Sequence, residues 1–262
     1  MSIIASISTI PNRLNSLTTV LTSLLNQTTL PTFLYISLAK YYPRSKKTYP
    51  EDDLHSLQTF LSSYPIPNKL IIYENDIGPC VKLITPLRHY SSFNKDDLIF
   101  TLDDDTPIYE RTIECLLQSY LKNKDAVYSF SGTRENRFFH AELLPENFDY
   151  FVIDIVGGYR GVLYPTYLIN NVEFYNWVDM FITYAHKKGI TAMHDDHIFS
   201  YYFKYKNIPR RVSNCPFNKN FTYTPIKNDD GIFNDPLSEN SINTLRETLY
   251  DKELNWVIDN LF

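Results

Sequence analysis

The stretch LIFTLDDD, residues 98–105, decides the fold class of this chain. Its apolar and β-branched residues predict a buried strand, and three carboxylates, Asp103, Asp104 and Asp105, follow where the strand ends. In open α/β sheets, ligands bind outside the carboxyl ends of the strands. Adjacent negative charges repel one another unless a cation or solvent screens them. Since Mg²⁺ and Mn²⁺ prefer oxygen ligands, the pattern predicts a divalent cation with ligand phosphates; a solvated acidic turn is the simpler alternative.

Strands and helices alternate around this stretch, which implies right-handed βαβ units and a mainly parallel sheet flanked by helices. After residue 124 the alternation ends, and an Asn-, Pro- and Asp-rich region follows residue 206. The predicted strands are 2–8, 33–38, 69–73, 97–102, 126–130 and 151–155, and the predicted helices are 14–27, 52–61, 79–89, 109–122, 174–187, 194–206 and 238–261.

Composition excludes some classes of protein. The formal net charge of -5, without a basic cluster, argues against a nucleic-acid binder that neutralises phosphates. The three cysteines form no CxxC pair, so neither a zinc site nor a disulfide framework is indicated and a reducing compartment is favoured. The opening MSIIASISTIPNR reads as a strand and not as a signal peptide, and no apolar run is long enough to span a membrane. We therefore expect a cytoplasmic protein.

Two further segments that follow predicted strands suit a nucleotide. Residues 76–83, DIGPCVKL, place a glycine turn at a helix start opened by proline, with Lys82 one turn into the helix. A helix N-terminus and a lysine favour an anion, although Lys82 could equally be a solvated surface residue. Residues 9–13, TIPNR, follow the first strand. A loop that only caps the next helix is the alternative interpretation of this segment.

Two segments in the second half suit a sugar and a proton transfer. Residues 157–161, GGYRG, contain glycines that permit close backbone approach, and Tyr159 could stack on a sugar ring; a hairpin turn is the alternative. Asp195 and Asp196 precede an apolar helical pattern, where they could cap the helix, act as a base, or do both.

Together these motifs resemble the GT-A fold glycosyltransferases, most of all the compact nucleotide-sugar transferases of bacteria and large DNA viruses. The resemblance implies a catalytic domain over 1–206, with a nucleotide-binding half (1–124) and an acceptor half (125–206), and a C-terminal appendage of loops and a helix over 207–262. It implies that Asp103 serves the ribose and the metal, that Asp105 binds Mn²⁺ or Mg²⁺, and that Asp196, or Asp195 if the register shifts by one, is the base. The other donor-side residues that it implies are Thr9, Pro11, Arg13, Asp76, Lys82, Asp104, Gly158 and Tyr159.

One departure from the family pattern concerns the metal. Many members supply a later histidine as a third ligand, but no histidine follows His197, so Asp229, Asp230 or water would replace it. The implied reaction is an inverting transfer of sugar from a nucleoside-diphosphate sugar, with UDP favoured, to a hydroxyl acceptor such as a glycan. A nucleotidyltransferase is the first alternative, although that class needs an early glycine-rich phosphate loop and residues 2–13 contain no glycine. A non-catalytic nucleotide- or sugar-binding module is the second.

Overall fold

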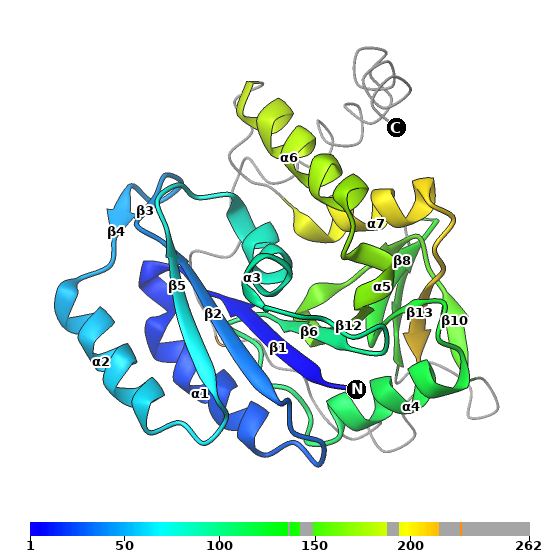
Figure 1. Cartoon of the computed structure of the whole chain (residues 1–262), viewed down its shortest axis with the longest axis horizontal. Helices are drawn as coiled ribbons and strands as arrows, with labels where there is room; N and C mark the ends of the chain where they lie inside the picture. Colours follow the sequence, from blue (N-terminus) through cyan, green and yellow to red (C-terminus); the bar gives the residue numbers. More distant parts are fainter. Residues whose placement is uncertain (136, 142–148, 188–193, 215–225, 227–262) are drawn as a thin grey trace.

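The computed structural model describes residues 1–135, 137–141, 149–187, 194–214 and 226 (Figure 1). An eight-stranded sheet forms its centre, and the strands β5, β2, β1 and β6 lie parallel to one another in that order. The prediction of an α/β fold with a mainly parallel sheet is confirmed. From one edge to the other the strands are β10 (Tyr150–Val152), β13 (Arg210–Ser213), β7 (Val127–Ser129), β12 (Val162–Pro165), β6 (Leu98–Leu102), β1 (Ile3–Ser8), β2 (Phe33–Ala39) and β5 (Asn68–Tyr73).

Helices cover both faces of this sheet (Figure 1). One face carries α1 (Leu14–Leu25), α2 (Glu51–Ser62) and α4 (Thr112–Lys122), and the other carries α3 (Val81–His89), α6 (Val172–Lys187) and α7 (Asp195–Tyr205). The short α5 (Thr166–Ile169) follows β12. Leucine and valine at helical spacing on α1 are fully buried against the sheet, which is why the pattern located this helix correctly.

Strand β12 was missed by the sequence analysis and changes the topology. It runs antiparallel to both of its neighbours, β6 and β7, in an otherwise largely parallel sheet. Its four residues follow directly on the glycine-rich turn, so the segment is too short to show a period of its own. As a result the chain passes the carboxyl end of β6 a second time, immediately after Gly161.

Two small sheets were also missed. Strands β8 (Ser131–Arg134), β9 (Arg137–His140) and β11 (Ile155–Val156) form one, and the hairpin β3 (Tyr41–Tyr42) and β4 (Lys47–Thr48) forms the other. The single strand predicted over 151–155 is two strands, β10 and β11, because the backbone N–H of Ile153 bonds to Arg210 and that of Asp154 to Thr133. The chain thus changes sheets at this point. The predicted helix 238–261 lies outside the described residues.

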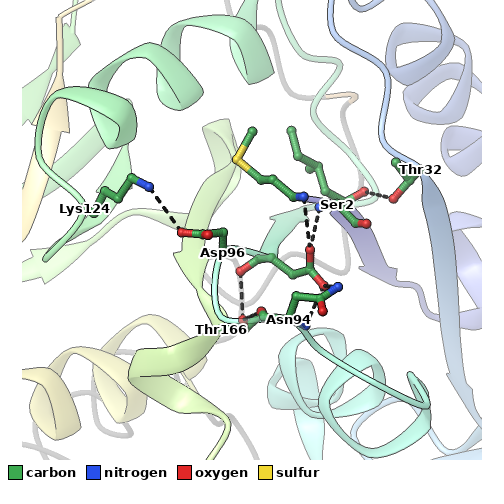
Figure 2. Close-up of polar contacts among 9 residues, drawn as sticks. Ser2, Thr32, Asn94, Asp96, Lys124 and Thr166 are labelled. Carbon is green, nitrogen blue, oxygen red and sulfur yellow. Dashed lines mark hydrogen bonds and ion pairs between the residues drawn. The ribbon is translucent and has the colours of Figure 1, made fainter.

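Asp97 joins three neighbouring segments at one end of the sheet, and Figure 2 labels its partners Ser2, Asn94 and Thr166. Its carboxylate is fully buried and accepts hydrogen bonds from the backbone N–H groups of Ser2 (2.6 Å) and Asn94 (2.8 Å). Its carbonyl oxygen accepts from the N–H and hydroxyl of Thr166 at 3.0 and 2.8 Å. The start of β1, the turn before β6 and the end of β12 are therefore joined through one residue.

The cysteines differ from expectation. Cys80 is a buried free thiol, but Cys115 on α4 is disulfide-bonded, so the expectation of unpaired cysteines is wrong for Cys115. Across the described helices, none combines the length and the apolar character that a bilayer crossing needs.

Candidate active site

A pocket opens where the parallel strands end, as the sheet topology requires. Loops after β1, β2, β5 and β6 form one side, and the start of α7 forms the other. The charged side chains that line it are Arg13, Arg44, Asp76, Lys82, Asp103, Asp104, Asp105, Asp195 and Asp196. Six carboxylates therefore face three permanent cations in this pocket.

The acid cluster after β6 is held by Arg13. The Nη1 atom of Arg13 lies 2.9 Å from Oδ1 of Asp104 and 2.8 Å from Oδ2 of Asp105. Burial and the neighbouring charge of Asp103 raise the pKa of Asp105 to about 6, even with Arg13 alongside. Arg13 therefore offsets only part of the repulsion within the cluster.

Lys82 is buried, with 3% of its surface exposed, which excludes the solvated surface position. Its Nζ atom lies 2.6 Å from Oδ1 of Asp103 and 2.9 Å from Oδ2 of Asp195. These carboxylates raise its pKa although burial alone would lower it, so Lys82 stays charged. The lysine therefore links the acid cluster after β6 to the acid pair at the start of α7.

Asp196 is held by the glycine turn. One carboxylate oxygen, Oδ2, accepts a hydrogen bond from the backbone N–H of Gly158 at 3.0 Å. The other, Oδ1, is shielded from solvent and has no hydrogen-bond partner among the described residues. Burial, and then the charge of Asp195, raise the pKa of Asp196 well above its ordinary value. This carboxyl group thus has a raised proton affinity and one oxygen available to a new donor.

The glycine at position 158 is required by this contact. A Cβ built there would lie 2.7 Å from Oδ1 of Asp196 and 3.4 Å from Nζ of Lys82. The turn is also fixed from behind, because the N–H of Gly157 donates to the carbonyl of Ser131 (2.9 Å) and the Ser131 hydroxyl donates to the carbonyl of Gly157 (3.1 Å). The sequence signal GGYRG therefore marks a close backbone approach as well as a turn.

Thr9 and Asp76 also line the pocket. The carboxylate of Asp76 accepts from the N–H of Gly78 at 2.8 Å, and burial raises its pKa. The carbonyl of Thr9 accepts from the buried hydroxyl of Tyr49 at 2.5 Å. Residues Ser37, Leu38 and Ala39 of β2 take part in the lining as well.

The hairpin β3–β4 contributes lining residues that the sequence analysis missed. Tyr42 and Arg44 line the pocket, and the guanidinium of Arg44 lies 5.5 Å from the centre of the Tyr42 ring. Lys47 anchors the hairpin by donating to the side chain of Asn12 at 2.8 Å. Its two-residue strands leave no periodic signal. His194, directly before the acid pair, is a further lining residue that was not singled out.

Most of the residues expected at the site meet in this pocket, and two do not. Pro11 and Tyr159 lie outside the lining; the hydroxyl of Tyr159 is instead 3.1 Å from Nδ1 of His140. Gly158 reaches the site through its contact with Asp196. Asp229 and Asp230 lie outside the described residues.

Asp103 and Asp105 suit a cation whose remaining ligands come from phosphates and water. Within the described part of the chain, no three His, Cys, Asp or Glu side chains converge as a complete ligand set. Mg²⁺ and similar ions in nucleotide sites commonly take one or two carboxylates and complete their shell with substrate phosphates and water. Asp103 and Asp105 both line the pocket, and burial, followed by the neighbouring charge of Asp103, raises the pKa of Asp105. The donor set therefore fits an ion that arrives with a diphosphate.

Comparison with solved structures identifies the architecture. A mannosyltransferase from Pyrobaculum calidifontis, solved with GDP-Man and Mn²⁺, superposes with a TM-score of 0.52 at 12% identity, over 82% of this chain and 55% of that chain. Residues 1–349 of S. aureus TarS, solved with UDP-GlcNAc, superpose at 0.50 and 13% identity, over 85% and 57%. The fold is GT-A. The predicted resemblance is thereby confirmed at the level of fold.

The extent of the GT-A likeness is limited. This chain spans a little over half the length of those two solved chains. A Francisella tularensis cytidylyltransferase, IspD, also matches, with a TM-score of 0.46 at 12% identity over 88% of this chain and 96% of that chain. No family model and no curated protein matches the sequence. At these identities the likeness establishes the GT-A fold alone, so the reaction has to be argued from the site.

Proposed function

We propose that this protein transfers a sugar from a nucleoside-diphosphate sugar to a hydroxyl group, with inversion at the anomeric carbon. The observation that carries the proposal is the state of Asp196. One of its oxygens is fixed by Gly158, the other is unpartnered among the described residues, and its pKa is raised. A carboxylate that is fixed through one oxygen can accept, on the other, a proton from a hydroxyl group that enters the pocket.

The reaction is a single displacement. The acceptor oxygen attacks the anomeric carbon while its proton passes to Oδ1 of Asp196, and the bond between that carbon and the diphosphate oxygen breaks. The bonding electron pair leaves with the nucleoside diphosphate. Because attack and departure take place on opposite faces of the sugar, the configuration inverts, through a transition state with oxocarbenium character.

Asp103 and Asp105 would hold a divalent cation together with the donor diphosphate. When bound, Mn²⁺ or Mg²⁺ offsets the negative charge that develops on the leaving group. Asp104 is occupied with Arg13 and buried, so its role is to position Arg13 beside Asp105. Lys82 holds Asp103 and Asp195 in place, and its own approach to the phosphates is secondary to those two contacts.

The nucleoside would occupy the part of the pocket that Thr9, Arg13 and Asp76 line. We expect a uridine diphosphate donor first, from the family resemblance and from the UDP-GlcNAc complex of the structurally similar TarS fragment. GDP-linked donors are the next to test, because the other similar structure holds GDP-Man and Mn²⁺.

A panel of nucleotide sugars tests the proposal. We expect one UDP-, GDP- or dTDP-sugar to stabilise the protein in a thermal-shift assay with Mn²⁺, since a ligand at 100 times its Kd contributes about 2.7 kcal/mol. The same donor should then yield free nucleoside diphosphate and an inverted product. Asp103→Asn should lose the shift, whereas Asp96→Asn, at the opposite end of the sheet, should keep it.

Two results would contradict the proposal. Release of pyrophosphate from a nucleoside triphosphate would make the protein a nucleotidyltransferase, although the loop after β1 has no glycine for such a phosphate site. Binding of a nucleotide sugar without turnover, across a broad set of acceptors, would make it a binding module.

A further inference from the structure

Strand β9 exposes a phenylalanine beside the candidate active site. Phe138 has 69% of its surface exposed, and the next residue, Phe139, points to the other face of the strand, where it stacks on Phe151 at 4.2 Å. Successive side chains of a strand alternate between faces, so Phe138 shares its face with His140. An exposed aromatic ring next to a packed one needs an explanation other than the core.

Three rings connect this face to the base. The rings of Phe138 and His140 are nearly parallel, at 8°, with centres 6.5 Å apart. The ring of Tyr159 meets His140 edge to face at 6.4 Å, and the Tyr159 hydroxyl lies 3.1 Å from Nδ1 of His140. Tyr159 directly follows Gly158, whose N–H holds Asp196. The rings therefore extend outward from the residue beside the base.

We propose that Phe138, His140 and Tyr159 form a binding surface for a saccharide chain, which supplies the acceptor hydroxyl. This inference rests on the proposed glycosyl transfer and names its acceptor as an oligosaccharide. Aromatic faces bind the apolar faces of sugar rings, and the exposed ring of Phe138 offers such a face. The ring centres of neighbouring pairs lie 6.5 Å and 6.4 Å apart, and three linked rings offer more contacts to a chain of sugars than to one sugar.

The size of the surface argues against a folded protein as its occupant. A stable protein interface buries about 800 Å² on each partner, and a completely buried aromatic side chain contributes about 150–250 Å². Three rings, of which only Phe138 is highly exposed, fall below that area. Their mixture of apolar faces and polar edges suits a ligand that is itself polar at its edges and apolar on its faces.

A printed array of linear oligosaccharides of two to six residues, with the matching monosaccharides, tests the proposal on the full chain. We expect at least one oligosaccharide to bind at least tenfold more tightly than its monosaccharide. Phe138→Ala should lose at least tenfold of that affinity and Phe138→Trp should retain it. Tyr167→Ala, which removes an exposed aromatic side chain on α5, is the matched control and should change nothing.

Nucleoside diphosphate binding separates this inference from the proposed function. Phe138→Ala should leave the thermal shift by UDP and Mn²⁺ unchanged, because Phe138 does not line the pocket. With an acceptor, the variant should raise KM for the saccharide and leave KM for the donor unchanged. Array binding that is absent, independent of chain length or insensitive to Phe138→Ala would overturn the inference. If the unmodified protein does not bind a nucleotide, the proposed function is overturned instead.

Discussion

The backbone N–H of Gly158 lies 3.0 Å from Oδ2 of Asp196, and a Cβ on residue 158 would lie 2.7 Å from Oδ1 of the same carboxylate. The glycine thus holds one oxygen and leaves room around the other. A side chain at this position would displace the oxygen that we propose as the proton acceptor. The contact joins the glycine turn before β12 to the first turn of α7, so the orientation of Asp196 depends on how these two segments pack together.

Replacing the base should harm the reaction far more than binding. We expect Asp196→Asn to lower kcat by about 10² to 10⁴, the usual contribution of a general base, with donor affinity nearly unchanged. Asp195→Asn is the matched control. It removes a partner of Lys82 and keeps Asp196, so a milder loss of kcat is expected. Steady-state kinetics with titrated donor give both parameters, and equal losses in the two variants would contradict the assignment.

The activity should rise with pH as Asp196 loses its proton. Burial and Asp195 raise the pKa of Asp196 above 3.8, and a base acts only when it is deprotonated, so the acidic limb of the kcat profile should have its midpoint above that value. The profile should be measured at saturating donor and Mn²⁺, since Asp105 also titrates near 6. A kcat that is flat down to the ordinary pKa of aspartate would argue against Asp196.

Cation binding should depend on pH in the same direction. With a pKa of about 6, Asp105 is protonated at pH 5 and charged at pH 7.5, and protons compete with metal ions for the ligand. The thermal shift by UDP and Mn²⁺ should therefore be larger at pH 7.5, and Asp105→Asn should lose it at both pH values. A shift that persists in the variant would exclude Asp105 as a ligand.

Ionisation of Asp105 should strengthen cation binding, but in the absence of metal it should lower the stability of the fold. Its folded-state pKa lies above the value of 3.8 expected when unfolded, so the folded state binds the proton more tightly. The contribution of Asp105 to stability is therefore lost as pH rises from 3.8 to about 6. Asp105→Asn should be at least as stable as the parent at pH 7.5 in chelator, as measured by urea unfolding.

Removing the buried lysine should destabilise the fold. Lys82→Met leaves Asp103 and Asp195 without their shared cation, and breaking a buried ion pair costs about 3–5 kcal/mol. The matched control is Lys40→Met, whose exposed pair with Glu74 should be worth about 0.2–1 kcal/mol. Adding Asp195→Asn to Lys82→Met should recover part of the loss. Equal urea midpoints for the two lysine variants would mean that Lys82 is solvated in the protein.

Asp97 and Asp96 lie outside the pocket lining, so their variants test the stability of the fold without changing the pocket. Asp97→Asn replaces one acceptor oxygen with a donor that faces two N–H groups, so we expect a loss of about 1–3 kcal/mol. Asp96→Asn, whose carboxylate pairs with exposed Lys124 (Figure 2), should change stability by less than about 1 kcal/mol. Nucleotide affinity should be the same in both variants, since neither residue lines the pocket.

The central strands and the acid cluster were predictable because apolar runs bounded by turn residues specify β1, β2, β5 and β6 without reference to the rest of the chain. The burial of Lys82 was not predictable. It depends on Asp103 and Asp195, which lie far from Lys82 in the sequence and meet it only in the fold. A lysine alone gives no sign of whether its partner is solvent, phosphate or carboxylate.

The same limit applies to the smaller elements. Strand β9 has the sequence RFFH, in which alternating faces cannot be distinguished from a loop over so few residues. The position of Tyr159 was not predictable either, because its hydroxyl contacts His140, which lies on β9 of the small sheet. Local patterns therefore located the donor side of the pocket more completely than the acceptor side.

Strand β12 fixes the distance between the glycine turn and the acid cluster after β6. Val162 pairs with Thr101, so the end of the glycine turn and the start of the acid cluster lie at neighbouring positions of one antiparallel ladder. Main-chain hydrogen bonds fix that spacing, and side-chain substitution leaves them intact. Substitutions in the surrounding loops can therefore reshape the pocket while the distance between the glycine turn and the acid cluster stays fixed.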